Sequence, residues 1–294
     1  MFRSPLKSDP SLILGFFWMS GTVISFIGMA IAGRELSDTL DTFQILTFRS
    51  LVALAITVIV IIQVGWHVTR TEHIFKHLFR NLFHFGGQFG WFLGVSLLPL
   101  ATVFALEYVT PVWTALLAVI FLGERMHHAR VLVICFGIFG VIIILKPGLN
   151  IIDPAAFVVI GAAFCYAVSY ISTKLMTETE RPLTILFYMN LIQFPLGLLF
   201  ASFNWVMPTI PDIKWILLVG VGGFFSHYCL TRALQVADTL TVIPIDFMRL
   251  PIIAIIGYFL YNETLEVTLL FGALIIFLGN YYNIRYENVL SKSI

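Results

Sequence analysis

The stretch Val131-Leu-Val-Ile-Cys-Phe-Gly-Ile-Phe-Gly-Val-Ile-Ile-Ile-Leu145 decides the fold class, because it has no charged residue and no alternation of polar and apolar side chains. A transmembrane β-strand would alternate over about ten residues. A bilayer core is about 30 Å thick, and a helix needs roughly 20 mostly apolar residues to cross it. This stretch therefore predicts a membrane-spanning helix over residues 129–146.

Apolar segments of this kind recur along the whole chain of 294 residues. The connections between them are mostly short, about 4 to 15 residues, which leaves no room for a soluble domain. The ten predicted spans are 11–31, 42–64, 79–97, 101–122, 129–146, 154–174, 183–203, 213–232, 239–261 and 266–284. The sequence therefore predicts an all-α, polytopic membrane protein with ten transmembrane helices.

The composition excludes several classes of protein. Hydrophobic residues make up 59% of the chain and charged residues 11%, whereas a soluble domain carries about 25% charged residues. So few charges cannot cover a water-facing surface, which excludes a soluble enzyme and a disordered protein. The net charge of +1 offers no basic patch for nucleic acid. The three cysteines lie in apolar runs, so no disulfide framework is expected.

Lysine and arginine are distributed unevenly between the two sets of connections. With the N-terminus in the cytoplasm, 12 of the 17 basic residues fall on the cytoplasmic side, 3 fall outside and 2 lie within spans. The outer residues are Arg34, Lys146 and Lys214, and the two in spans are Arg49 and Arg249. Because cytoplasmic connections carry the excess of basic residues, we expect a multi-pass protein of the cell inner membrane with both termini in the cytoplasm.

The two halves of the chain resemble each other at residues that are rare in membranes. The aligned pairs, at an offset of 139 residues or close to it, are Thr102-Val103 with Thr241-Val242, Glu107 with Asp246, Glu124 with Glu263, Pro111 with Pro251, and Gly86-Gly87 with Gly222-Gly223. Each half has five predicted helices, an odd number, so the second copy enters the membrane from the opposite side. We predict two inverted five-helix repeats, residues 11–146 and 153–285, an arrangement typical of secondary transporters with a site at the repeat interface.

Ten short helices arranged as five plus five resemble the drug/metabolite transporter superfamily, in particular carriers with two EamA-type domains. The resemblance covers about residues 11–285 and rests on Phe48-Arg49, Leu100-Ala-Thr-Val-Phe-Ala-Leu-Glu-Tyr-Val-Thr-Pro111, Phe121-Leu-Gly-Glu-Arg125 and, more loosely, Asp238-Thr-Leu-Thr-Val-Ile-Pro-Ile-Asp246 with Asn262-Glu263. Asn190 stands in the second copy where Arg49 stands in the first. The resemblance implies the fold and transport. It is closest to bacterial members that include S-adenosylmethionine uptake carriers, but substrates differ widely among members, so the cargo stays open.

Four charged residues fall well inside the predicted spans, namely Arg49, Glu107, Asp246 and Arg249. Each costs about 2.5–3.5 kcal/mol at the bilayer centre, and their charges sum to zero, so we expect them to pair. Asp246 and Arg249 share one helix face at i, i+3, while Arg49 and Glu107 lie at depths where they can meet. Such pairs either fix helix packing or line a substrate cavity. A proline follows each acidic residue and frees backbone carbonyls that can face a cavity.

Other polar and aromatic residues recur at helical spacing, as His84, Gln88 and Trp91 do at i, i+4, i+7. Converging stripes would form a polar, aromatic-walled cavity for a small organic solute, although hydroxyls and amides also serve simply to hold helices together. The candidate substrate-binding residues are Trp18, Arg49, His84, Gln88, Trp91, Glu107, Tyr166, Tyr170, Asn190, His227, Asp246 and Arg249. No catalytic residue, metal ligand or cofactor is predicted.

Two further groups of residues are interpreted as structural. Glu124 and Glu263 fall at helix ends beside the membrane interface, where they act as anchors rather than substrate ligands. Glycine pairs in the fifth and tenth spans suit close helix packing, either as scaffold or as the face of a homodimer; they are Gly137 with Gly140 and Gly272 with Gly279.

These observations favour a secondary carrier for a small polar organic metabolite, such as an amino acid or another zwitterion, driven by a proton or counter-solute gradient. The titrating group is then Glu107, Asp246 or a histidine. An uptake carrier for S-adenosylmethionine or a nucleotide-like solute is the alternative. A channel is disfavoured because no span contains a filter-like loop or a ring of like charges. A membrane-embedded enzyme is disfavoured because the one tight histidine pair, His127-His128, points to different helix faces.

Overall fold

The computed structural model describes residues 12–123, 126–146, 153–176, 179–236, 245–264 and 266–292. Across these ranges the regular elements are all helical, which confirms the predicted fold class. They are α1 (Leu12–Leu36), α2 (Thr42–Val64), η1 (Trp66–Thr69), α3 (Ile74–Leu97), α4 (Leu100–Glu107), α5 (Thr110–Leu122), α6 (His128–Leu145), α7 (Pro154–Met176), α8 (Pro182–Ala201), η2 (Ser202–Asn204), α9 (Asp212–Val236), α11 (Arg249–Tyr261) and α12 (Val267–Lys292).

Most of these helices are long and apolar enough to cross a membrane. Eight spans qualify by length and composition among the described residues, with α4 and α5 counted together, and α11 is a shorter apolar helix. The chain is therefore a multi-pass membrane protein. The predicted span 79–97 falls in α3, which is not among the eight and buries charged and amide side chains such as Arg80 and Asn81. The first residues of the predicted span 239–261 lie outside the described part of the chain.

The predicted span 101–122 is interrupted, because α4 ends at Glu107 and α5 begins at Thr110. Pro111 occupies the first turn of α5, where its missing N–H cannot bond to the Glu107 carbonyl. The Thr110 hydroxyl donates to that carbonyl instead, at 2.7 Å. The disturbance expected from the proline is therefore present, and it places Glu107 at a helix end in the middle of the membrane-spanning region.

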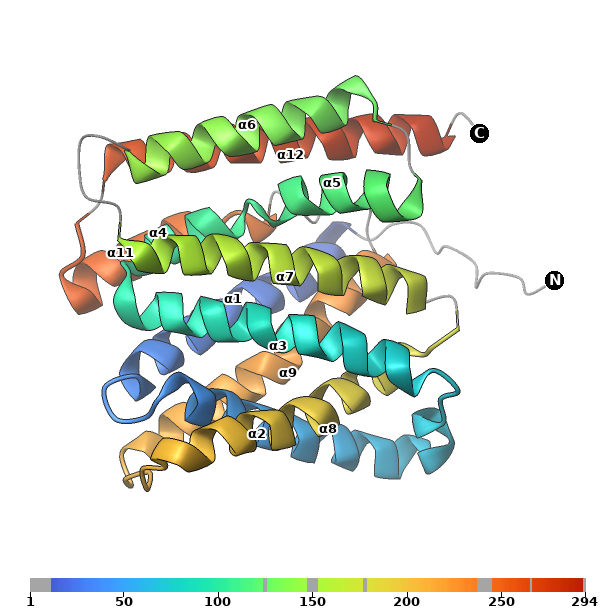
Figure 1. Ribbon diagram of the computed structural model, residues 1–294, viewed down its shortest axis with the longest axis vertical. Coiled ribbons are helices and arrows are strands. Elements are labelled where there is room, and N and C mark those ends of the chain that lie inside the picture. The colour runs from blue at the N-terminus through green and yellow to red at the C-terminus, as the bar shows by residue number, and fades with distance from the viewer. Residues whose placement is uncertain are drawn as a thin grey trace.

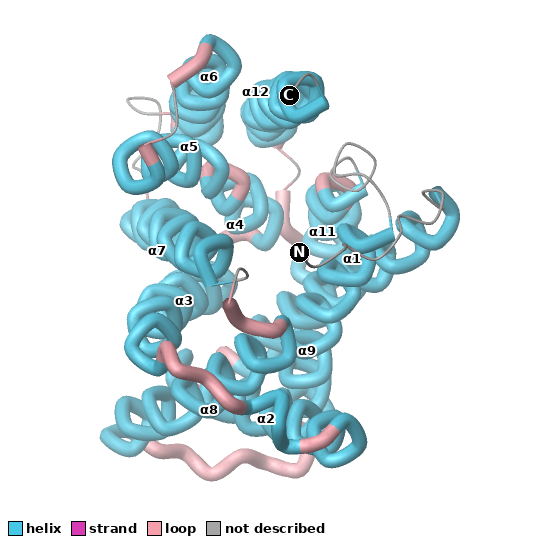
Figure 2. The backbone as a smooth tube through the Cα atoms, turned by 90° about the vertical axis from the view of Figure 1, so that its right-hand side faces the viewer, coloured by secondary structure: helices cyan, strands magenta, loops and turns pink. Residues whose placement is uncertain are grey.

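The helices pack in pairs that each join the first half of the chain to the second. In Figures 1 and 2, α1 lies along α9 and α3 along α7, while α2 packs on α8, α6 on α12, and α4 on α11. The pairing is reciprocal: the first long helix of each half lies against the third long helix of the other. The α4–α11 pair occupies the centre, with α3 and α7 on one side and α1 and α9 on the other (Figure 2).

Glycines allow α6 and α12 to approach backbone to backbone. A Cβ atom added to Gly140 would lie 2.7 Å from the Gly272 carbonyl oxygen, and one added to Gly272 would lie 2.6 Å from the Gly140 oxygen. The close packing expected of these glycines is therefore formed within one chain.

The bundle has two distinct ends. The helix α1 begins and α12 ends at the same end, on the right in Figure 1, together with the α2–α3, α5–α6 and α7–α8 connections; we call this the terminal end. The opposite end carries the α1–α2, α3–α4, α6–α7, α8–α9 and α11–α12 connections, and we call it the distal end.

Candidate functional site

The centre of the bundle holds one basic and two acidic side chains in contact. Arg249 Nη2 donates to Asp246 Oδ2 at 2.7 Å, and Arg249 Nη1 lies 3.9 Å from Glu107 Oε1. The side chains of Arg249, Glu107 and Asp246 are 6%, 12% and 23% exposed. The ion pair expected between Asp246 and Arg249 is thus present, but the expectation that both lie on one helix is wrong, because a turn at residues 247–248 separates Asp246 from the start of α11. Glu107 joins the pair from α4. When both carboxyls are ionised, two carboxylates share one guanidinium and the formal charge of the cluster is −1.

Aromatic rings surround the Arg249 guanidinium. Its Cζ atom lies 4.5 Å from the ring centroid of Phe26, 5.5 Å from that of Tyr108 and 5.7 Å from that of Phe104. A ring face within about 6 Å attracts a cation through its quadrupole. The rings therefore add to the carboxylates in holding positive charge at this point. We call the set Phe26, Phe104, Glu107, Tyr108 and Asp246 the cation cage.

The Glu107 carboxylate is held from a second side by α3. Trp91 Nε1 donates to Glu107 Oε2 at 2.9 Å, while Oε1 faces Arg249. The Trp91 ring is itself 2% exposed and packs edge-on against Phe104 at 5.7 Å. The hydrogen bond from Trp91 therefore positions the Glu107 carboxylate beside Arg249.

A cavity of about 450 Å³ leads from the terminal end to the cation cage. Its mouth includes Arg130, near the start of α6, and Lys174, near the end of α7. Its floor is formed by the ion cluster, and its walls come from α5, α7, α11 and α12. The lining residues include Glu107, Tyr108, Thr110, Thr114, Tyr170, Asp246, Phe247, Arg249, Asn280 and Asn283. A solute entering here meets both carboxylates directly.

A second buried polar network lies beside the cage. The Gln88 amide oxygen accepts from Arg49 Nη1 at 2.8 Å and Nη2 at 3.0 Å, and its nitrogen donates to Gln193 Oε1 at 3.0 Å, an amide orientation assigned from these partners. Gln193 Nε2 lies 2.9 Å from His84 Nδ1. The His84 ring lies 5.7 Å from that of His227. The network therefore links α2, α3, α8 and α9 with neutral partners around one guanidinium.

Both networks border a small cavity of about 20 Å³, which has room for about one water molecule. The sequence-predicted residues that line it are Arg49, His84, Gln88, Trp91, Glu107, Tyr166, Tyr170 and His227. The structure thus brings together ten of the twelve predicted residues, since Asp246 and Arg249 line the larger cavity with Glu107 and Tyr170.

The expected pairing of Arg49 with Glu107 is wrong. Both side chains line the small cavity, but Glu107 bonds to Trp91 and approaches Arg249, while Arg49 bonds to Gln88. In the described part of the chain, no carboxylate forms an ion pair with Arg49. Helix depth can be read from a sequence, but the direction in which two helices face each other cannot.

Trp18 and Asn190 line neither cavity. The Trp18 ring packs against Tyr228, with 5.8 Å between centroids, and against the Arg232 guanidinium at 5.6 Å. Asn190 Nδ2 donates to the Leu186 carbonyl of its own helix at 3.0 Å. Trp18 therefore packs between α1 and α9, while Asn190 bonds within α8.

The distal end is closed by contacts around Glu263, in the α11–α12 connection. Its Oε2 accepts the backbone N–H of Leu100 at 2.8 Å, and its Oε1 lies 3.2 Å from Arg34 Nη2. Arg34 also donates to the Leu98 carbonyl. Burial raises the pKa of the Glu263 carboxyl, against the opposing effects of the Leu100 N–H and Arg34. Glu124, its partner in the sequence alignment, lies outside the described residues.

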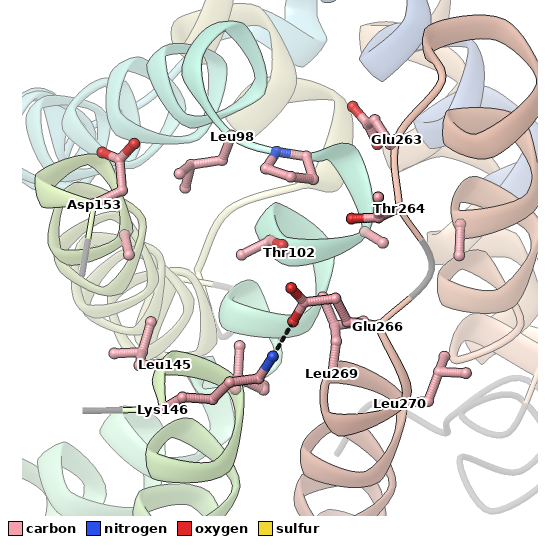
Figure 3. A pocket seen from close by; sticks show the side chains of 15 residues that line it. Leu98, Thr102, Leu145, Lys146, Asp153, Glu263, Thr264, Glu266, Leu269 and Leu270 are labelled. Atoms are coloured by element: carbon pink, nitrogen blue, oxygen red, sulfur yellow. Dashed lines mark hydrogen bonds and ion pairs between the residues drawn. The ribbon is translucent and has the colours of Figure 1, made fainter. Parts of the chain in front are cut away.

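A separate pocket of about 180 Å³ opens at the distal end, outside these contacts (Figure 3). Glu263 and Thr264 lie on one side of it and Leu98 on another, and an ion pair between Lys146 and Glu266 crosses it. The terminal end therefore has a cavity of about 450 Å³ that reaches the ion cluster, while the distal end has a smaller, separate pocket.

The sequence did not indicate three residues of the cage, Phe26, Phe104 and Tyr108, or the linking amide Gln193. Phenylalanines are too common in this chain, with 28 of them, to be singled out. Tyr108 had a signal, since it lies between Glu107 and Pro111 at the helix break. Within the described ranges, no group of three or more metal-ligating side chains gathers in one place.

A family model described as the EamA-like transporter family matches this chain twice, over residues 13–146 and 153–285. A solved structure shares the fold, with a TM-score of 0.66 and 15% sequence identity, over 91% of this chain and 95% of that one.

Two kinds of named relative are similar along most of the chain. The S-adenosylmethionine uptake transporter of Rickettsia bellii is 27% identical over 282 residues, which cover 96% of this chain and 97% of the relative. The riboflavin transporter of Brucella anthropi is 28% identical over 252 residues, which cover 84% of this chain and 89% of the relative. These relatives are described as transporting different solutes.

Proposed function

Because the chain belongs to the EamA-like transporter family, we propose that it is a secondary carrier that moves a small polar organic metabolite across the cell inner membrane by alternating access. The observation that carries this proposal is the asymmetry of the central path. A cavity of about 450 Å³ reaches the ion cluster from the terminal end, while the contacts of Glu263 with Leu100 and Arg34 close the distal end. A carrier that exposes its site to one side at a time needs this asymmetry.

The moving parts in this proposal are two inverted repeats, residues 11–146 and 153–285. The reciprocal packing of α1 on α9 and α3 on α7 supports this division, since each half contributes the same two helix positions. The ion cluster contains Glu107 from one repeat and Arg249 from the other, so relative movement of the repeats would change access to it.

The terminal end faces the cytoplasm in this proposal, so the structure corresponds to an inward-facing carrier. Support comes from the basic residues near this end, which cytoplasmic surfaces favour. They include Arg70, Lys76, Arg80, Arg130, Lys174, Arg181, Arg232 and Arg285. At the distal end, the basic residues are Arg34, Lys146 and Lys214.

The proposed cargo is an organic cation or zwitterion, such as an amino acid or a sulfonium compound. The cluster presents charges of both signs next to aromatic faces, and its formal charge of −1 favours a positively charged group. The relatives described as S-adenosylmethionine uptake transporters support this class, because that compound carries a sulfonium, an ammonium and a carboxylate. The relatives described as riboflavin transporters favour the second candidate, a neutral planar solute that would stack on Tyr108 or Tyr170.

The driving force in this proposal is a proton or counter-solute gradient. A proton-coupled carrier needs a titrating group that the substrate can reach. Glu107 and Asp246 line the larger cavity, while His84 and His227 border the small cavity next to it. Asp246→Asn distinguishes the two mechanisms: loss of a pH-dependent rate with binding retained would mark a proton-coupling carboxylate.

The experiment that tests the proposed function is a thermal-shift screen of a metabolite library on detergent-purified protein, followed by uptake into proteoliposomes. We expect at least one solute to raise the melting temperature and to enter the vesicles with saturation, faster when the vesicles already contain it. Flux that stays proportional to concentration would favour a channel. The absence of any protein-dependent flux would contradict the proposal.

A further inference from the structure

The cation cage already holds a cation, which belongs to the protein itself. The guanidinium of Arg249 occupies the point where three ring faces and two carboxylates converge, and this point is the floor of the open cavity. Aromatic rings combined with carboxylates form the environment that proteins use to bind organic cations. The side chain that fills this environment therefore stands where a ligand cation would bind.

The guanidinium is held unequally by the two carboxylates. Its Nη2 bonds to Asp246 at 2.7 Å, and its Nε donates to the Asp246 backbone carbonyl at 3.2 Å. Toward Glu107 it presents Nη1, which lies at 3.9 Å and forms no hydrogen bond with the described residues although it is buried. Arg249 is therefore anchored to Asp246, which lies three residues earlier in the chain and before the start of α11, and is only loosely engaged with Glu107, so it can withdraw from Glu107 without losing Asp246.

We propose that Arg249 is a tethered stand-in for the cationic group of the substrate, which displaces it from Glu107 and the aromatic rings on binding. This inference rests on the proposed function and narrows the substrate class to small organic cations and zwitterions with an ammonium or sulfonium group. Trp91, which donates to the other oxygen of Glu107, keeps that carboxylate in place during the exchange.

The stand-in has a consequence for the empty carrier. Closing the cavity removes water from two carboxylates, and a buried charge without a partner is costly. Arg249 compensates them when no substrate is bound, so the empty carrier can still change conformation. Without this guanidinium, the charge of the two carboxylates would be compensated only when a cationic substrate is bound. The carrier would then exchange substrate for substrate but lose net uptake.

The test compares net uptake with exchange in proteoliposomes, with tritiated S-adenosylmethionine as the cationic probe and riboflavin as the neutral one. For Arg249→Gln we expect net uptake of S-adenosylmethionine to fall at least about tenfold, while exchange into vesicles preloaded with the same compound stays within about twofold of wild type. Arg249→Lys keeps a tethered cation and should restore part of the net uptake. The control Arg232→Gln removes a guanidinium that faces an aromatic ring outside both cavities, and should leave both rates unchanged.

A second measurement needs no transported substrate. Arg249→Ala vacates the cage, so millimolar methylguanidinium or trimethylsulfonium should raise the melting temperature of this variant but not of wild type or Arg232→Ala. If neither compound raises the melting temperature of Arg249→Ala, the cage does not bind free cations and the inference is overturned.

The transport outcomes separate the inference from the proposed function. If Arg249→Gln loses net uptake and exchange equally, or loses neither, the inference that Arg249 is a stand-in is overturned. The proposed function as a carrier would still hold. If the wild-type protein takes up riboflavin but not S-adenosylmethionine, the cationic substrate class is overturned, and the proposed function as a carrier would still hold. No saturable flux of any solute in wild type would overturn the proposed function and, with it, the stand-in.

Discussion

The Oε2 atom of Glu263 accepts a hydrogen bond from the backbone N–H of Leu100 at 2.8 Å, across 163 positions of sequence. Leu100 begins α4, and the first N–H groups of a helix have no partner within it. A carboxylate from the second half of the chain therefore caps a helix of the first half. Gly257 has no side chain, and any Cβ there would collide with this carboxylate. Glu263 thus forms a helix cap in addition to its ion pair with Arg34.

Substitutions of Glu263 should separate the cap from the ion pair. Glu263→Gln keeps an oxygen acceptor for Leu100 and removes only the charge, so the distal end should stay closed. Glu263→Ala leaves the buried N–H without a partner, which costs about 1–3 kcal/mol and should favour the opened state by roughly 5- to 150-fold. The measurement is the labelling rate of a cysteine at Ala101, which is 8% exposed and lines the distal pocket, in a variant without the native cysteines.

The matched control for this prediction is Asp38→Asn, which removes an exposed carboxylate in the α1–α2 connection that does not line the distal pocket, and should not change labelling. Labelling in Glu263→Gln as fast as in Glu263→Ala would show that the ion pair, not the cap, closes the distal end.

The distal closure should also depend on pH. Burial raises the pKa of Glu263 above its ordinary value of 4.5 in the closed state, whereas an opened, hydrated carboxyl would return toward that value. The closed state therefore binds the proton more tightly, so its advantage is present at low pH and is lost as the pH rises through the raised pKa. With the native Glu263 present, labelling at Ala101→Cys should accelerate as the pH rises through the raised pKa of Glu263. In Glu263→Gln only the ordinary pH dependence of the thiol should remain, and an identical profile in both proteins would contradict the prediction.

Gly223→Ala should disrupt the Arg49 network. A Cβ at this position would lie 2.9 Å from Arg49 Nε and 3.0 Å from Cζ. The guanidinium can move, but only by leaving Gln88, so we expect transport to fall about tenfold and stability to fall by about 1–3 kcal/mol. Gly161→Ala is the matched control, because a Cβ there meets nothing within 4 Å and alanine favours the helix by about 1 kcal/mol. The melting temperature and the uptake rate are measured for both variants. If Gly223→Ala and Gly161→Ala have equal values, the position of the Arg49 guanidinium does not matter for transport or stability.

The proposed orientation can be checked with single cysteines at Asn150 and Lys292 in intact cells. A reagent that cannot cross the membrane should label Asn150→Cys from outside and reach Lys292→Cys only after the cells are permeabilised. Labelling of both positions from one side would contradict five spans between them.

The sequence was sufficient to predict the helices and their approximate depths, because apolar length and rare charges carry that information directly. Pro111 even marked the interruption beside Glu107, since a proline cannot complete the helical ladder. The partner of Arg49 could not be predicted. Which face of α2 turns toward α3 depends on packing of the whole bundle, and an amide such as Gln88 can replace a carboxylate as partner.

The same limit explains why Trp18 and Asn190 lie outside both cavities. Each is a polar or aromatic residue at a plausible depth, but α1 and α8 turn these positions toward neighbouring side chains or their own backbone. The aromatic cage was missed for the opposite reason. Phe26 and Phe104 are ordinary membrane residues until the fold brings the Arg249 guanidinium over their rings.

The contact between Gly140 and Gly272 limits how the two halves can move. At this point the backbones of α6 and α12 touch without intervening side chains, so neither helix can slide along the other without lifting the carbonyl of one past the backbone of its neighbour. Sideways tilting needs no such lift. Any rocking of one half against the other should therefore turn about this contact as a pivot, and the displacement should grow with distance from it, becoming largest near α2 and α8 at the far side of the bundle (Figure 2).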